Sequence, residues 1–129
     1  ERIHNKKRQI KISDVRILVE KVISECNLEA YEEKNHRYKL NNQYGITITD
    51  KEKGYIAIRH IDYDNKGYDK NQDKEVLKLK EILNGRNYNI SVNAWIGKKV
   101  FSKFGNNDND IIEGICKEIK ELKEDIQKI

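Results

Sequence analysis

The chain has 129 residues, of which 36% are hydrophobic and 37% charged, and its formal net charge is +4. This length suffices for one domain with one modest core, and the patterned apolar residues favour a folded chain over a disordered one. No apolar run approaches the ~18 residues of a membrane span and no signal-peptide pattern follows the basic start, so we expect a cytoplasmic protein with no membrane partner.

The positive charge gathers at the N-terminus. Residues 1–11 hold Arg2, Lys6, Lys7, Arg8 and Lys11 against Glu1 alone, so the remainder of the chain is neutral overall. We therefore divide the sequence into a basic N-terminal arm, residues 1–11, and a single α+β domain, residues 12–129.

Helical periodicity is found in three segments. Ser13 can cap a helix that runs to about residue 26 with one apolar face. A second helix is expected from about residue 73 to 83, followed by Gly85, which suits the left-handed position after a helix. A third helix is expected from about Asp110 to the end of the chain, with apolar residues at steps of three and four.

Alternating patterns predict five strands between these helices. Residues 37–40, 44–49 and 55–63 read as a meander, and residues 88–96 and 100–104 as a hairpin whose turn is Gly97-Lys98-Lys99. Short turns require antiparallel strands. The predicted fold class is α+β: a five-stranded, mainly antiparallel sheet with three helices, in the order α-βββ-α-ββ-α. We expect the helices on one face and the other face at least partly open.

The two cysteines, Cys26 and Cys116, have no CxxC or zinc-site spacing and fall among apolar helix positions. We interpret them as small buried side chains with reduced thiols, in keeping with a reducing compartment. A disulfide between them is the alternative.

The sequence contains no recognisable catalytic or cofactor motif. His60 and Asp62 could form an acid/base pair, but the polar end of a half-buried strand is the simpler interpretation. The loop from Asp62 to Asp73 partly imitates a calcium loop, yet Lys66 stands where a ligand oxygen is needed. We predict no metal and no cofactor, and we favour a non-enzymatic protein.

Two known groups of proteins share this order of elements. The order α-βββ-α-β resembles the core of PD-(D/E)xK nucleases, whose acids hold Mg²⁺; Asp50 and the run Asp64-Asn65-Lys66 are the nearest candidates for those residues. The full order also resembles the small dimeric chaperones of type III secretion effectors. Both resemblances rest on element order, and a nuclease is the less favoured function.

A binding module is the favoured function, with nucleic acid as the expected ligand. Tyr55, Arg59 and Tyr63 share the strand face opposite the core, and Trp95 lies on the equivalent face of a later strand, where bases could stack. The arm would add phosphate contacts. The predicted nucleic-acid-binding residues are Lys6, Lys7, Arg8, Arg59, Tyr55, Tyr63 and Trp95. The alternative is a protein-binding module: an inhibitor, an immunity-like factor or a chaperone-like small dimer.

The seam of the last helix raises the possibility of a homodimer. Its apolar residues recur twice in seven positions, whereas a core-facing helix usually shows about three in seven. This pattern predicts a candidate dimer interface at Leu122, Ile126 and Ile129. Packing of the same residues in the core of one chain is the competing interpretation, and it is the one we favour.

Overall fold

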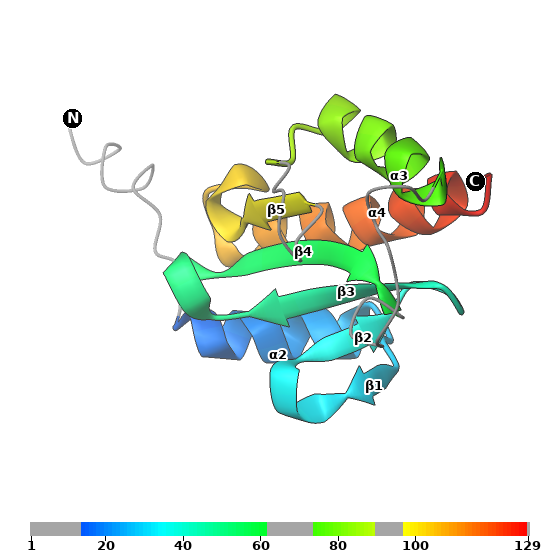
Figure 1. Ribbon diagram of the computed structural model, residues 1–129. Coiled ribbons are helices and arrows are strands. Elements are labelled where there is room, and N and C mark those ends of the chain that lie inside the picture. The colour runs from blue at the N-terminus through cyan, green and yellow to red at the C-terminus, as the bar shows by residue number, and fades with distance from the viewer. Residues whose placement is uncertain (1–13, 62–73, 90–96, 129) are drawn as a thin grey trace.

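Five antiparallel strands form one sheet, and three helices pack against it in the computed structural model (Figure 1). The structure describes residues 14–61, 74–89 and 97–128, and at residues 74–76 it describes the backbone alone. The predicted fold class is thereby confirmed. The strands are β1 (Ala30–Glu32), β2 (Arg37–Lys39), β3 (Tyr44–Thr49), β4 (Tyr55–His60) and β5 (Gly97–Val100). The helices are α2 (Val15–Glu25), α3 (Lys74–Gly85) and α4 (Asp108–Ile126), and short 3-10 turns occupy η1 (Glu33–Asn35), η2 (Lys51–Lys53) and η4 (Phe101–Lys103).

The strands follow one another in the sheet in chain order, β1-β2-β3-β4-β5. Ile46 faces Ile58 across the β3–β4 pair, and Ile48 faces Ile56. Because side chains alternate along a strand, these isoleucines share one face, which we call the core face. All four are fully buried.

The helices lie on the core face. Figure 1 shows α2 and α4 behind the sheet, leaving the face toward the viewer without a helix. Leu18 and Val22 of α2, Leu83 of α3, and Ile115 and Leu122 of α4 belong to the same buried cluster as the strand isoleucines. Each helix therefore buries one stripe and exposes the other side. Among the described helices, none has the combination of length and apolar character that a membrane span requires.

The strand boundaries differ from the prediction at three places. The sequence did not predict β1, and β5 begins at Gly97, where we expected a hairpin turn. The predicted strand 100–104 was wrong beyond Val100, because Phe101–Lys103 form the 3-10 turn η4. A Cβ at Gly97 would lie 2.6 Å from Cδ2 of Tyr88 and 2.8 Å from Cδ1 of Leu83. The absence of a side chain at Gly97 therefore lets Tyr88 and Leu83 pack directly against the backbone of β5. Residues 90–96 lie outside the described residues, so most of the predicted strand 88–96 does too.

The helix ends also differ in detail. Asp14, rather than Ser13, is the N-cap of α2: its Oδ1 accepts a hydrogen bond from the backbone N of Arg16 at 2.9 Å. Beyond α3 the left-handed position belongs to Asn87, with φ 66°, and not to Gly85. Asparagine tolerates this conformation better than most residues, so it can end the helix in place of glycine.

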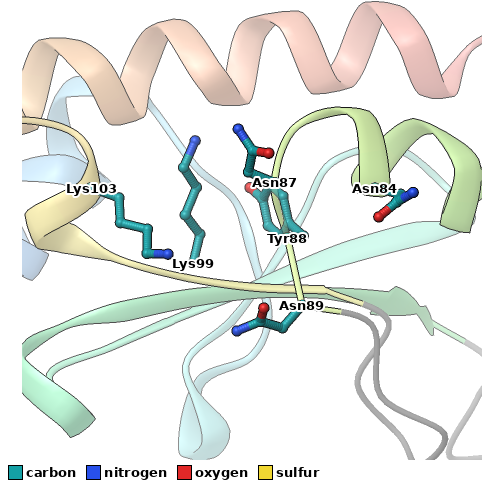
Figure 2. Close-up of a pocket in the computed structure, with 6 residues that line it drawn as sticks. All are labelled: Asn84, Asn87, Tyr88, Asn89, Lys99 and Lys103. Atoms are coloured by element: carbon teal, nitrogen blue, oxygen red, sulfur yellow. The ribbon is translucent and has the colours of Figure 1, made fainter.

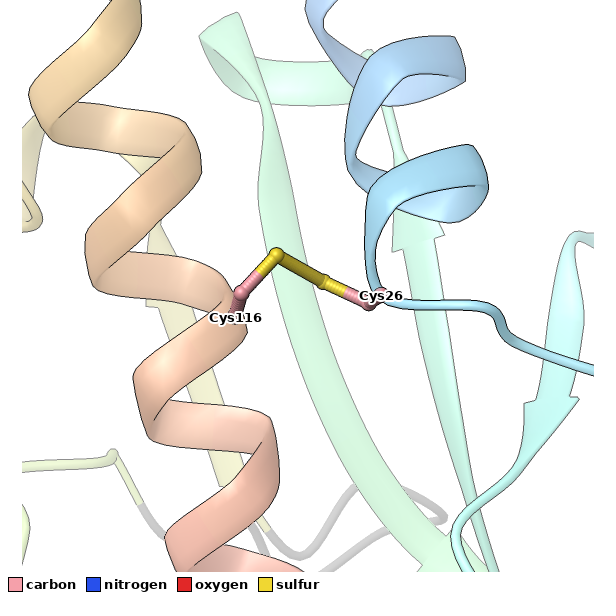
Figure 3. The surroundings of a disulfide bond; sticks show 2 residues. All are labelled: Cys26 and Cys116. Carbon is pink, nitrogen blue, oxygen red and sulfur yellow. A yellow bond between two sulfur atoms is a disulfide. The ribbon is translucent and has the colours of Figure 1, made fainter.

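Cys26 and Cys116 form a disulfide, so the interpretation as free thiols was wrong. The bond joins the C-cap of α2 to the middle of α4, with the two Cα atoms 5.4 Å apart (Figure 3). Both side chains are partly buried against the core. The apolar positions of both cysteines reflect the contact between two helices that lie side by side on the sheet.

The second half of α4 packs in the core of the single chain. Leu122 is 0% exposed and Ile126 is 2% exposed, so the prediction that they project toward a second copy was wrong. Both residues belong to the buried cluster that α4 shares with α2 and the sheet. Ile129 lies outside the described residues, and a homodimer stays a prediction.

Removing the disulfide should destabilise the fold. The cysteines are 90 residues apart in the chain, and closing a loop of that size stabilises the folded state by roughly 4–5 kcal/mol in the chain-entropy description. Urea unfolding of Cys26→Ala/Cys116→Ala should show a free energy of unfolding lower than the parent's by about 3–5 kcal/mol. Dithiothreitol should lower the parent's stability and leave the double variant unchanged. Two free thiols in the parent under non-reducing mass spectrometry would contradict the bond.

Placing a charge at Ile126 tests the core role of α4. A lysine there would have to bury an unpaired ammonium, so Ile126→Lys should lower the free energy of unfolding by about 3 kcal/mol or more. Glu124→Lys, on the exposed side of the same helix, should change it by less than about 0.5 kcal/mol. Equal unfolding midpoints for the two variants would show that this part of α4 is not packed.

Candidate nucleic-acid interface

The sheet face without a helix carries cations from three strands. Arg37 of β2, Ala57 of β4 and Lys98 of β5 occupy one row across the sheet, through Thr47 of β3. The next row contains Lys39, Gly45 and Arg59. Alternation turns these side chains away from the isoleucines, and we call their surface the cationic face.

Small residues form the centre of the cationic face. Ala57 is 0% exposed and Thr47 is 3% exposed, which means that neighbouring side chains lie over them. Gly45 leaves room for the Tyr31 ring, because a Cβ there would lie 2.5 Å from Tyr31 Cε1. The larger neighbouring side chains therefore cover the small residues at the centre of the cationic face.

Two of the cations are held in ion pairs at the margin of the face. Nη1 of Arg37 donates to Oε1 of Glu32 at 2.8 Å. Lys98 pairs with Glu52, and its Nζ lies 4.9 Å from the centroid of the Tyr55 ring. These contacts fix both side chains in place and balance their charge.

A basic recess of about 230 Å³ opens where η1 and η2 approach each other. Lys34 and Lys51 are exposed at its rim, and no ion pair is described for either of them within the resolved segments. The buried hydroxyl of Thr47 has no hydrogen-bond partner among the described residues. The basic recess is lined by Lys34, Asn35, His36, Arg37, Thr47, Thr49, Lys51 and Tyr55.

This combination of groups suits a phosphate. Lysine and arginine side chains balance its charge, and a hydroxyl or an amide donates a hydrogen bond to its oxygens. Lys34 and Lys51 supply charge that is not engaged in a described ion pair. Thr47 supplies a donor that the fold itself leaves unused.

The predicted stacking residues occupy the expected face but are not presented on it. Tyr55 is 9% exposed and Arg59 is 3% exposed, so neither offers a flat surface to a base. The assumption that a face without a helix is an open face was wrong here, because long neighbouring side chains cover the centre. Lys6, Lys7, Arg8, Tyr63 and Trp95 lie outside the described residues.

Sequence reasoning missed Lys34, Arg37, Lys51 and Lys98. Arg37 and Lys98 could have been found from strand alternation, had β5 been placed correctly. Lys34 and Lys51 lie in 3-10 turns, and only the approach of η1 to η2 brings them together.

The candidates for catalysis and metal binding are not assembled in the described part of the chain. His60 packs edge-on against Tyr44 on the core side, with ring centroids 5.0 Å apart. Asp50 is exposed beside η2. The described residues contain no cluster of three metal-ligating side chains. Asp62, the calcium-like loop and Asp64-Asn65-Lys66 lie outside them.

Comparison of the chain with protein-family models, with curated proteins and with solved structures finds no match.

Replacing the unpartnered hydroxyl should stabilise the protein. Thr47→Val keeps the shape of the side chain and removes a buried polar group, so the free energy of unfolding should rise by about 1–2 kcal/mol. Thr49 is the matched control, because its Oγ1 accepts a hydrogen bond from the backbone N of Lys51 at 3.3 Å. Thr49→Val should lower stability by about 1 kcal/mol. A loss of stability in Thr47→Val would mean that its hydroxyl has a partner.

Proposed function

We propose that this protein binds nucleic acid through phosphate contacts, with the basic recess as the principal contact of the folded domain. The observation that carries the proposal is that two lysines without a described ion pair line the same recess as a buried hydroxyl without a described hydrogen-bond partner. Phosphate contacts supply most of the affinity of non-specific binding, and they need charge rather than exposed rings. The proposal therefore does not depend on stacking by Tyr55.

The basic N-terminal arm extends this surface in the proposal. Lys6, Lys7 and Arg8 would add phosphate contacts, while base stacking by Tyr63 and Trp95 stays a prediction. A protein partner is the weaker alternative, because the exposed large hydrophobic residues within the described segments are Ile17 and Leu77, one on each of two helices. Scattered apolar side chains of this kind are ordinary on protein surfaces.

A cytoplasmic location also stays a prediction, and the Cys26–Cys116 disulfide weighs against it. Disulfides persist mainly in oxidising compartments. The bond lies between α2 and α4, on the side of the sheet opposite the basic recess. Binding of nucleic acid should therefore be the same with and without dithiothreitol at a temperature where both forms are folded.

Fluorescence anisotropy with a labelled strand of about 20 nucleotides, longer than a typical 4–16-nucleotide site, tests the function. Salt titrations of the parent should give a Kd of ~10⁻⁴–10⁻⁶ M near physiological salt, weakening as salt increases. Lys34→Ala/Lys51→Ala should lower the slope of log Kd against log salt by about 1.4, because on a single strand each phosphate that a lysine no longer neutralises removes about 0.7. Lys6→Ala/Lys7→Ala/Arg8→Ala should lower it further.

The matched control removes the same charge from the helix side. Lys117 and Lys120 are exposed on α4, so Lys117→Ala/Lys120→Ala should leave the salt slope unchanged. An equal loss in this control would mean that net charge alone drives binding. Absence of any binding at about 50 mM salt, where phosphate contacts are strong, would overturn the proposed function.

A further inference from the structure

A recess of about 320 Å³ lies between α2 and the strands β2 and β3, and we call it the helix–sheet recess. Its volume is at the lower end of the ~300–1,000 Å³ range of small-molecule sites, which suits one ring system rather than a length of polymer. Its apolar lining comes from Val19, Ile23 and Tyr38, and its charged lining from Arg16, Glu20 and Asp50. The recess therefore combines an apolar wall with polar groups of both signs.

Tyr38 brings an unused hydroxyl to the helix–sheet recess. The residue packs in the core and is only 8% exposed. No described residue forms a hydrogen bond with its hydroxyl, and yet that oxygen is not closed off from solvent as the hydroxyl of Tyr88 is. Burial, and then the charge of Glu33, raise the pKa of Tyr38, so the hydroxyl stays protonated. A ligand in the recess can therefore accept a hydrogen bond from a donor that packing holds in place.

The charged residues of the helix–sheet recess are accessible to a ligand. Nε of Arg16 lies 4.0 Å from Oδ2 of Asp50, which is an ion pair but too long for a hydrogen bond. Both side chains are at least half exposed, and ion pairs of this kind contribute little to stability. Glu20 is exposed one helical turn after Arg16. Two carboxylates that accept hydrogen bonds are therefore available beside the Tyr38 donor.

The helix–sheet recess adjoins the basic recess. His36 and Thr49 line both of them, at the end of the sheet where β2 begins and β3 ends. In a nucleic acid a base and its phosphate are joined through one sugar, so a strand with a phosphate in the basic recess brings a base close to the second recess. In a single strand that base can leave the stack and enter a pocket, because no pairing has to be broken.

A wider recess, of about 770 Å³, lies beside the end of α3 and the strand β5, but it offers no comparable set of groups (Figure 2). Lys99 is already paired with Glu118, and its Nζ lies 4.6 Å from the centroid of the Phe104 ring. The Tyr88 hydroxyl is closed off from solvent. None of the residues that line this recess also lines the basic recess, so a strand held there is not directed into it.

We propose that the helix–sheet recess binds one unpaired cytosine or adenine base of the strand whose phosphate occupies the basic recess. Both bases carry an amino group next to a ring nitrogen that accepts hydrogen bonds. The amino group donates to the carboxylate of Asp50 or Glu20, as the N4 amino group of cytosine does to acidic side chains in DNA recognition, and the ring nitrogen accepts from Tyr38. Uracil has a carbonyl and an N–H at these positions, so a carboxylate repels it. The inference rests on the proposed function, because the phosphate positions the base.

Fluorescence anisotropy with three labelled strands of about 20 nucleotides, at about 50 mM salt, tests the base site. The strands are oligodeoxycytidine, oligodeoxyuridine and an abasic strand with the same number of phosphates. Cytosine and uracil have rings of the same size, so their comparison isolates the amino group and the adjacent ring nitrogen. The cytidine strand should bind about tenfold more tightly than the other two, since a hydrogen bond to a charged group is worth about that factor.

Two variants locate the preference in the recess. Tyr38→Phe removes a hydroxyl without a described hydrogen bond, so it should keep the fold and reduce the preference for cytidine over uridine to about threefold or less. Glu20→Gln/Asp50→Asn should abolish the preference. Glu25→Gln/Glu29→Gln is the matched control, because it removes two exposed carboxylates that do not line the recess. This control should keep the tenfold preference, even though the loss of negative charge strengthens its binding to every strand.

The possible failures of this inference and of the proposed function are distinguishable. Equal binding of the three strands by the parent would overturn the base site and leave phosphate binding in place. A preference for cytidine that persists in both Tyr38→Phe and Glu20→Gln/Asp50→Asn would assign base selectivity to another part of the chain and would also overturn the inference. Absence of binding to all three strands would overturn the proposed function, and the base site with it.

Discussion

The alternation of side chains along β3 and β4 is the constraint on which the rest of the structure depends. Every even-numbered residue from Tyr44 to Ile48, and from Ile56 to His60, turns toward the helices. A shift of one residue in the pairing would send the isoleucines to the other face and bring Thr47 and Arg59 into the core. The burial of four isoleucines therefore fixes the register, and the register fixes which polar residues form the cationic face. The function proposed for that face follows from the packing of the opposite one.

The cations of the fold differ in how their charges are used. Arg86 is bonded to Glu118, Glu121 and Asp125, so its charge is balanced within the fold. Lys34 and Lys51 line the basic recess, and no described ion pair involves either of them. Charge of this kind attracts a polyanion over a Debye length of ~10 Å. This difference is the reason that the proposed function rests on the basic recess and not on Arg86.

The sequence predicted the fold class because its signals are local. Strand alternation at 44–49 and 55–58 and the periodicity of α4 depend on neighbours within a few residues, and both are confirmed. The site depends on contacts between distant segments. No local pattern predicts that Lys34 and Lys51 line one recess. Nor does a local pattern predict that Tyr88 packs against Gly97, or that Cys26 and Cys116 are bonded. The expectation that Tyr55 is openly exposed was wrong for the same reason, since its exposure is set by neighbours on other strands.

The disulfide and the basic recess occupy different parts of the layered structure, and this separation has a physical consequence. Cys26 and Cys116 tie α2 to α4 across the helix layer, while Lys34 and Lys51 belong to the turns η1 and η2. A cross-link of this kind mainly restricts the unfolded chain. Its reduction therefore changes how much of the protein is folded, and leaves the groups of the basic recess in place wherever the fold persists.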